Sequence, residues 1–276
     1  MPVTFTLDLR NVVTVSTQAQ LRAVRDLPFC HVCGKLFAPA DETNHDHVPA
    51  QTCFDLSDRN PPLKLKTHFR CNNEHTGNDE KLGELIAAQR HKALDPANTR
   101  LHVNLLTAAD GSLHAAYFDN LDVTGAIRRW VGGFHAALYR EPLFPGTWFQ
   151  VTLPLPHGSV KEDAVHIEPV PKQHLAFVEA LKSNRALGRI DAVVSCSGKM
   201  RYECVWAEAD GGDGLFCIFG LDIYGWIGIG DAKNFGARGC TGAYILGSRS
   251  APAGASVATR LVVEFQNRAP FDPFGP

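Results

Sequence analysis

The fold is decided by two short stretches, Cys30-His31-Val32-Cys33 and His68-Phe69-Arg70-Cys71, and by Asn44-His45-Asp46-His47-Val48-Pro49 between them. Each outer stretch separates two ligand-type side chains by two residues, a spacing that lets both converge on one tetrahedral ion. Thiolate and imidazole are both good zinc donors, so the sequence predicts a structural zinc ion. Its predicted ligands are Cys30, Cys33, His68 and Cys71. The acidic and imidazole groups of the middle stretch lie outside this set and indicate a second, catalytic site that the zinc holds in place.

These three elements, in this order, resemble the HNH endonuclease domain, also called the ββα-metal or His-Me finger. The similarity is to its zinc-stapled, treble-clef-like branch, which includes phage junction-resolving endonucleases. The family pattern is a Cys-x-x-Cys pair, an Asp-His motif continued by Val or Ile and a Pro, and a second pair followed at once by Asn or His. The chain matches it between residues 29 and 86 with Asp46-His47-Val48-Pro49 and with Asn72 after the second pair. It departs from the pattern in having His68 where the family has cysteine.

The resemblance implies roles for three residues of a catalytic site. Asp46 and Asn72 would be the ligands of a catalytic Mg²⁺ or Mn²⁺, and His47 would be the general base that takes a proton from the attacking water. The chemistry agrees, because carboxylate and amide oxygens are hard ligands and a neutral imidazole with a pKa near neutrality accepts a proton at pH 7. The implied reaction is hydrolysis of DNA phosphodiester bonds to 5′-phosphate and 3′-hydroxyl ends.

Three further polar residues are candidates for the same site. Asn60 lies one residue before the usual place of the asparagine that orients the histidine, and it is also suited to cap the turn before Pro61. His45 flanks Asp46 and is an alternative ligand or base. On a strand, however, His45 and His47 would share one face and Asp46 would point to the other. His75 follows the second pair closely and could contact phosphate or the ion.

Local positive charge is the expected means of holding a nucleic-acid backbone. The formal net charge of the chain is −2, without the global basic character of many nucleic-acid binders. The residues expected to bind nucleic acid are Lys64, Lys66, Arg70, His75 and Lys81. DNA is the predicted partner, with RNA or branched nucleic acid as alternatives. A homodimer or larger complex is compatible with this activity, since cutting both strands usually needs two active sites.

Length and composition predict two domains and an α+β fold. A chain of 276 residues is long for one domain. Residues 1–98 are predicted to form the zinc-stapled HNH module of knuckle, hairpin, second knuckle and helix, whose small core the zinc stabilises. Residues 99–276 are predicted to form a mixed α+β accessory or substrate-selecting domain, because nothing in them reaches the specificity of a motif. The alternative to catalysis is a zinc-stabilised nucleic-acid or protein binding module.

Hydrophobic periodicity predicts the secondary structure. Helices are expected at Gln18–Arg25, from Asn78 to Pro96, at Asp122–Arg140 and at Pro171–Leu187, and a hairpin at Leu101–Tyr117. Strands are expected within residues 3–15 and at 61–66, 148–155, 165–170, 190–196, 200–207, 216–223, 243–247 and 261–265.

The composition is that of an ordinary soluble globular protein, with 45% hydrophobic and 20% charged residues. No apolar run approaches the length of about 18 residues that a membrane span needs. The first ten residues lack the basic and apolar regions of a secretory signal, so we expect a cytoplasmic protein without a membrane partner. Cysteines outside the metal set are expected to be buried thiols, namely Cys53, Cys196, Cys204, Cys217 and Cys240.

Overall fold

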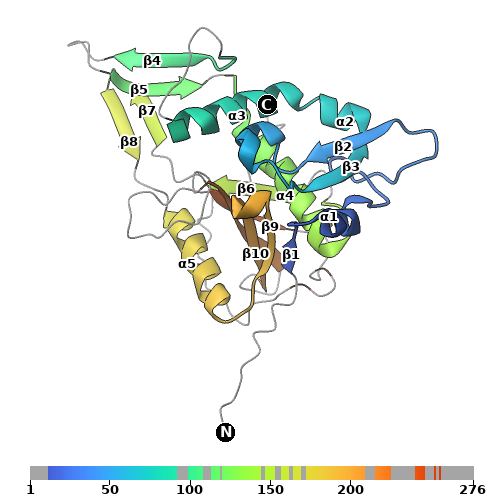
Figure 1. The fold of residues 1–276 in the computed structure, drawn as a ribbon. Helices are drawn as coiled ribbons and strands as arrows, with labels where there is room; N and C mark the ends of the chain where they lie inside the picture. The colour runs from blue at the N-terminus through green and yellow to red at the C-terminus, as the bar shows by residue number, and fades with distance from the viewer. Residues whose placement is uncertain are drawn as a thin grey trace.

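The computed structural model describes residues 12–91, 99–107, 113–118, 120–143, 147–152, 157–161, 164–168, 172–208, 215–224 and 240–245, with residues 252 and 255. It is a mixed α+β structure around one six-stranded sheet (Figure 1). The helices are α1 (Gln18–Arg25), α2 (Phe69–Asn73), α3 (Thr76–His91), α4 (Val123–Tyr139) and α5 (Lys172–Ala186). The strands are β1 (Val12–Thr14), β2 (Thr43–His47), β3 (Lys64–His68), β4 (Val103–Thr107), β5 (Leu113–Phe118), β6 (Trp148–Thr152), β7 (His157–Lys161), β8 (Ala164–Glu168), β9 (Asp191–Ser195), β10 (Met200–Glu208), β11 (Leu215–Ile223) and β12 (Cys240–Ile245).

The main sheet has the strand order β1-β9-β10-β11-β12-β6. Its first pair is parallel and the other four pairs are antiparallel. Successive side chains of a strand point to opposite faces, so β10 contributes to two cores. Tyr202 and Trp206 belong to the core on the α4 side, whereas Val205 packs with Phe177 and Leu181 of α5. Helices α4 and α5 therefore cover opposite faces of the sheet (Figure 1).

The hairpin β2–β3 lies on the α4 side of the sheet and leads directly into α2 and α3 (Figure 1). Its antiparallel register pairs Thr43 with His68 at one end and His47 with Lys64 at the other. The remaining small sheets are the hairpins β4–β5 and β7–β8. The position of β2–β3 matters for function, because this hairpin carries both the second metal pair and the Asp-His motif.

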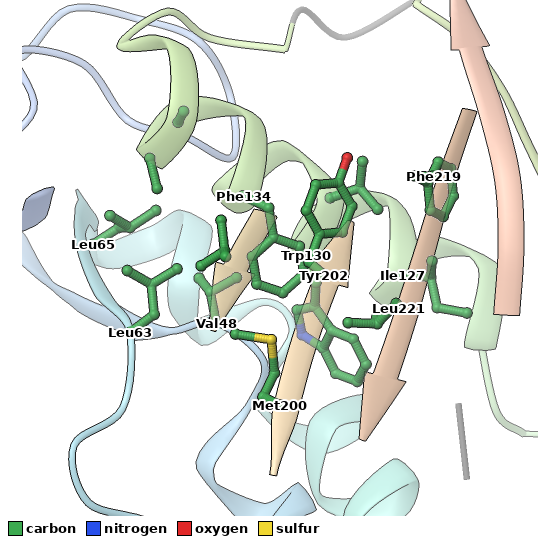
Figure 2. Close-up of a cluster of buried hydrophobic side chains, with 14 of the residues drawn as sticks. Val48, Leu63, Leu65, Ile127, Trp130, Phe134, Met200, Tyr202, Phe219 and Leu221 are labelled. Atoms are coloured by element: carbon green, nitrogen blue, oxygen red, sulfur yellow. The ribbon is translucent and has the colours of Figure 1, made fainter. Parts of the chain in front are cut away.

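One continuous core joins the hairpin to the sheet through α4. Figure 2 shows Val48, Leu63 and Leu65 from the hairpin region in one cluster with Trp130 and Phe134 of α4 and with side chains of the main sheet. All five side chains are buried. In addition, β1 is a strand of the main sheet although it falls within the predicted first domain. The boundary between residues 98 and 99 remains a prediction, but the two parts share one hydrophobic core.

The sequence predictions for regular structure agree with most of these elements. The expected helices correspond to α1, α3, α4 and α5, and the expected hairpin at Leu101–Tyr117 corresponds to β4–β5. Local signals explain two helix starts: the Thr17 hydroxyl accepts from the Gln20 amide at 3.2 Å, and the Asp122 carboxylate accepts from the Gly125 amide at 2.7 Å. The short helix α2 and the strand β7 were not predicted, since neither shows a clear apolar period. The strands predicted before residue 12 and at 261–265 lie outside the described residues.

Two further expectations concern membranes and thiols. None of the helices that the structure describes has both the length and the apolar character needed to cross a bilayer. The five cysteines predicted to be buried thiols are indeed free and buried, which confirms that prediction.

Candidate metal centre

The four predicted zinc ligands converge on one point. The donor atoms of Cys30, Cys33, His68 and Cys71 all lie within 4.8 Å of one another, so the cluster could hold a zinc ion. We call these four residues the zinc set. A tight turn places the first pair: Gly34 has a φ of 75°, and its amide donates to the carbonyl of Cys30 at 2.8 Å. The second pair is split between elements, with His68 at the end of β3 and Cys71 in α2.

The protonation chemistry of the zinc set suits a cation. Although burial opposes ionisation, the hydroxyl of Thr67 at 3.0 Å and nearby backbone amides lower the pKa of the Cys30 thiol to about 6. Burial and the adjacent charges of Cys30 and Cys33 raise the pKa of Cys71 to about 12. The thiols of Cys30 and Cys71 therefore cannot both be ionised at neutral pH without a compensating positive charge. A zinc ion supplies that charge, so the donor set fits this metal.

A carboxylate orients the histidine of the zinc set. The His68 Nδ1 atom lies 3.4 Å from the Cys33 sulfur, whereas its Nε2 atom lies 3.1 Å from Asp41 Oδ2. The Asp41 carboxylate is itself held by the backbone amide of Ala38 at 2.6 Å. A carboxylate on the far ring nitrogen fixes the tautomer and direction of a metal-binding histidine. Asp41 therefore positions His68 for a metal ion, a role that no sequence motif indicated.

A second polar cluster lies at the other end of the hairpin. Asp46 is only 3% exposed, and its Oδ2 atom lies 2.8 Å from Arg129 Nη1 and 3.2 Å from His31 Nε2. The Nη2 atom of Arg129 donates to Asp79 Oδ1 of α3. We call His31, Asp46, Asp79 and Arg129 the Arg129 cluster. Its guanidinium, supplied by α4, joins the hairpin to α3.

Burial and the Arg129 guanidinium act in opposite directions on the pKa values of the two carboxylates in the Arg129 cluster. Against the effect of burial, His31 and Arg129 hold the pKa of Asp46 below its ordinary value. Burial raises the pKa of Asp79 to about 6, although Arg129 opposes that shift. The Arg129 side chain is 3% exposed, and its Nε atom has no hydrogen-bond partner among the described residues. Asp46 is thus an ionised carboxylate whose charge is already balanced inside the protein.

A cavity of about 520 Å³ opens beside this cluster. Asp79 and Arg129 line it, together with His75, Asn78 and other residues from the start of α3, from α4 and from the loop before α4. His75 lies close enough to Arg129 and Asp46 for their charges to influence its pKa, which burial lowers. Of the residues predicted to contact phosphate or the catalytic ion, His75 is therefore the one beside the cavity.

His47 has a different environment from Asp46. Along β2 the exposure alternates, with His45 exposed, Asp46 buried and His47 partly buried, as expected for a strand. Burial and the charge of Lys64 lower the pKa of His47 to about 4, and its buried Nε2 atom has no described hydrogen-bond partner. The imidazole is neutral at pH 7 as predicted, but it is a weaker base than the expected pKa near neutrality implies.

The remaining predicted site residues lie around the second pair. Asn72 is partly buried in α2, and Asn60 is exposed before β3, with its backbone carbonyl accepting from the Ser197 hydroxyl at 3.0 Å. Neither residue lines the cavity beside Arg129. His45 approaches Asp26 at 4.0 Å. These placements leave the proposed roles of Asn60, Asn72 and His45 as predictions.

The predicted nucleic-acid-binding residues occupy the hairpin and the two following helices. Lys66 packs over the ring of Phe37 at 4.6 Å, and Arg70 pairs with Glu74 at 2.7 Å. The Lys81 ammonium donates to the Asn120 carbonyl at 3.0 Å. Lys64 is partly buried on β3, opposite His47. Several of these cations thus already have a partner within the chain.

The residues predicted to hold a second, catalytic ion suit a divalent cation less well than the zinc set suits zinc. The known contacts of Asp46 are with the Arg129 guanidinium and the His31 imidazole, and the guanidinium competes directly with a metal for the carboxylate. Within the described part of the chain, the zinc set is the one group of three or more His, Cys, Asp or Glu residues whose donor atoms lie this close together. As folded, Asp46 is held by Arg129 where the resemblance requires it to hold a divalent ion.

Sequence reasoning missed the members of the Arg129 cluster other than Asp46. A signal for Arg129 was present, because it falls on the apolar stripe of its helix with Ala126, Trp130 and Gly133. A charged residue on a buried helix face needs a buried partner. The sequence does not say which carboxylates provide it, since Asp46 and Asp79 are distant along the chain.

Comparisons of this chain with protein-family models, with curated proteins and with solved structures found no match, so a functional assignment rests on the residues and geometry given above.

Proposed function

We propose that this chain is a metal-dependent endonuclease of the HNH type that hydrolyses phosphodiester bonds in DNA. The observation that carries the proposal is the convergence of Cys30, Cys33, His68 and Cys71 on one point. Two of these ligands sit on either side of the β3–α2 junction, and β3 pairs with the strand that carries Asp46 and His47. This order of knuckle, hairpin and helix is the arrangement that the sequence resemblance implies.

In this proposal His47 holds the proton-accepting nitrogen. Its ring is neutral at pH 7, and its Nε2 atom is buried without a described partner, so its lone pair is free for a proton from a water molecule that enters beside it. Asp46 and Asn72 are the proposed ligands of Mg²⁺ or Mn²⁺, which would stabilise charge on the departing oxygen when bound. Lys64, Lys66, Arg70, His75 and Lys81 are the proposed contacts to the nucleic-acid backbone.

The second candidate is a zinc-stabilised binding module without catalysis. One specific observation favours it: Arg129 already balances the charge of Asp46 in a buried position, where His31 also contacts the carboxylate. A carboxylate used in this way stabilises the fold and is not available to a metal ion. RNA and branched nucleic acid are alternative substrates under the first proposal and alternative partners under the second.

The test is cleavage of a supercoiled plasmid by the purified, zinc-loaded chain with Mg²⁺ or Mn²⁺. We expect wild-type protein to nick or linearise the plasmid and His47→Ala to lose this activity. The comparison variant is His45→Ala, which removes the alternative base on the same strand; the His45 side chain is 42% exposed. It should keep cleavage and zinc content.

Three results decide between the candidates. Equal cleavage by wild type and His47→Ala would reject the role of His47. Binding to DNA without cleavage under any divalent metal would support the non-catalytic module instead. Parallel reactions with single-stranded RNA and with a four-way DNA junction separate the possible substrates.

A further inference from the structure

Arg129 occupies the position of a cation between two acidic side chains. Its two terminal nitrogens contact different carboxylates, with Nη1 on Asp46 of β2 and Nη2 on Asp79 of α3. A divalent ion held between a strand and the following helix would use the same carboxylate oxygens and supply the same sign of charge. The guanidinium is thus a cation of the chain's own in a place where a metal ion would be stabilised.

We propose that Arg129 competes with a divalent cation for Asp46 and Asp79, so that the ion binds there only when the guanidinium leaves. Both carboxylates are buried, and a buried pair of like charges cannot remain without a compensating cation. Either the guanidinium or a metal ion can meet that requirement, but the two cannot share the same oxygens. The inference rests on the proposed function only for the kind of ion, Mg²⁺ or Mn²⁺.

The surroundings of Arg129 are compatible with its displacement. Its Nε atom is buried without a described partner, so the guanidinium has one donor that its present position leaves unused. The side chain also borders the 520 Å³ cavity, where His75 and Asn78 offer further polar atoms. A guanidinium that moved toward the cavity would leave Asp46 and Asp79 facing each other. The imidazoles of His31, whose Nε2 atom lies 3.2 Å from Asp46, and of His75 at the cavity could then join them as donors.

Asp79, and not only Asp46, is therefore assigned to the divalent-ion site. Asp79 is buried at the start of α3, on the helix that follows the second zinc pair. It belongs to neither the Asp-His motif nor the position directly after Cys71. The chemical class of ligand is a hard divalent cation, because the donors are carboxylate oxygens, with the imidazoles of His31 and His75 nearby.

The test measures Mn²⁺ binding to the full, zinc-loaded chain. The electron paramagnetic resonance signal of free Mn²⁺ reports how much of the ion stays unbound. We expect Arg129→Gln to bind a single Mn²⁺ at least about tenfold more tightly than wild type, because the apparent affinity scales with the fraction of open sites. The matched control is Arg128→Gln, since Arg128 is the neighbouring arginine and donates to the Thr147 carbonyl. It should bind Mn²⁺ as weakly as wild type, and Asp46→Asn added to Arg129→Gln should remove the gain.

Several outcomes overturn the proposal. It fails if wild type and Arg129→Gln bind Mn²⁺ equally, or if the gain survives Asp46→Asn. If Arg129→Gln loses its zinc or its fold, Arg129→Lys replaces it. A single ammonium cannot bridge both carboxylates, so this variant must also bind Mn²⁺ more tightly than wild type.

The Mn²⁺ measurement is independent of nuclease activity. Tighter binding by Arg129→Gln with no DNA cleavage by any variant would support the competition and reject the endonuclease. Metal-dependent cleavage by wild type, with no gain in Mn²⁺ affinity in Arg129→Gln, would support the endonuclease and reject the competition.

Discussion

The zinc set and the Arg129 cluster hold the two ends of one hairpin, and they do so by different means. At the first end, His68 is paired with Thr43 and joins three thiols that need an external cation. At the second end, Asp46 is paired with Leu65 and receives its cation from α4 of the same chain. Residue His31 connects the two ends, because it lies between Cys30 and Cys33 in sequence and contacts Asp46 in space.

The difference shows how the source of the positive charge decides what each end can do. A thiolate set completed by zinc is a structural element whose stability depends on metal supply. A carboxylate pair completed by arginine needs no metal, and it links the hairpin to the main sheet through α4. The first end is therefore expected to depend strongly on zinc, whereas the second is expected to depend on the buried ion pairs of Arg129.

The largest expected effect is the loss of zinc. Cys33→Ser should abolish stoichiometric zinc binding and cooperative folding of the hairpin, because structural zinc contributes about 10–16 kcal/mol to folding in zinc-finger peptides. Zinc analysis and thermal unfolding by circular dichroism measure this. Cys240→Ala is the matched control, since Cys240 is a buried free thiol of β12. A chelator that left the unfolding temperature unchanged would contradict the prediction.

The next effect is the removal of the guanidinium. Arg129→Met leaves Asp46 and Asp79 buried without their cation, which should lower the free energy of unfolding by about 3–5 kcal/mol. Adding Asp46→Asn and Asp79→Asn removes the uncompensated charge and should restore most of that loss. Urea unfolding measures both variants, and Arg128→Met serves as the control. If the triple variant were as unstable as the single one, charge balance would not be the reason for the arginine.

A smaller effect tests how closely α4 approaches the hairpin. A Cβ on Gly133 would lie 2.8 Å and 2.9 Å from the two methyl carbons of Val48. Gly133→Ala should therefore lower the free energy of unfolding by about 1–3 kcal/mol, and Val48→Ala in the same chain should relieve the clash. At Gly77 of α3 a Cβ would meet nothing within 4 Å, so Gly77→Ala is the control and should stabilise slightly. An unchanged free energy of unfolding in Gly133→Ala would mean that α4 lies farther from the hairpin than the structure shows.

The smallest effect is a pH dependence in which His47 and Asp79 oppose each other. The pKa of His47 is lowered to about 4 in the folded state, so His47 binds fewer protons there than in the unfolded chain. Its contribution to the free energy of unfolding is therefore lost as pH falls from about 6.5 toward 4. The pKa of Asp79 is raised to about 6 in the folded state, so Asp79 binds more protons there than in the unfolded chain. Its contribution to the free energy of unfolding is therefore lost as pH rises through about 4 to 6. The two contributions largely cancel in wild type.

Substitution of the histidine separates the two contributions. The difference in unfolding free energy between wild type and His47→Gln should shrink by at most about 2 kcal/mol between pH 7 and pH 5. Both proteins carry the same zinc set, so its own acid sensitivity cancels in the difference. Urea midpoints at the two pH values measure it, and parallel pH profiles would contradict the lowered pKa of His47.

Much of the local structure could be predicted because its signals lie within a few residues of one another. The zinc pairs follow from their two-residue spacing, and α4 follows from its apolar stripe and the Asp122 cap. The strands β9, β10 and β11 follow from their β-branched and aromatic runs. For the same reason, the sequence indicated the Asp-His motif but not the partners of Asp46.

The sequence by itself determined the four residues of the zinc set and the main helices, and it predicted the alternation of His45, Asp46 and His47 only for the case in which they form a strand. Only the tertiary structure decided that β1 joins the main sheet, that one core spans both halves of the chain, and that Arg129 lies between Asp46 and Asp79. The physical reason is range. Spacing and periodicity act between neighbours in the chain, whereas the partner of a buried charge is chosen by packing between helices and strands that are far apart in sequence.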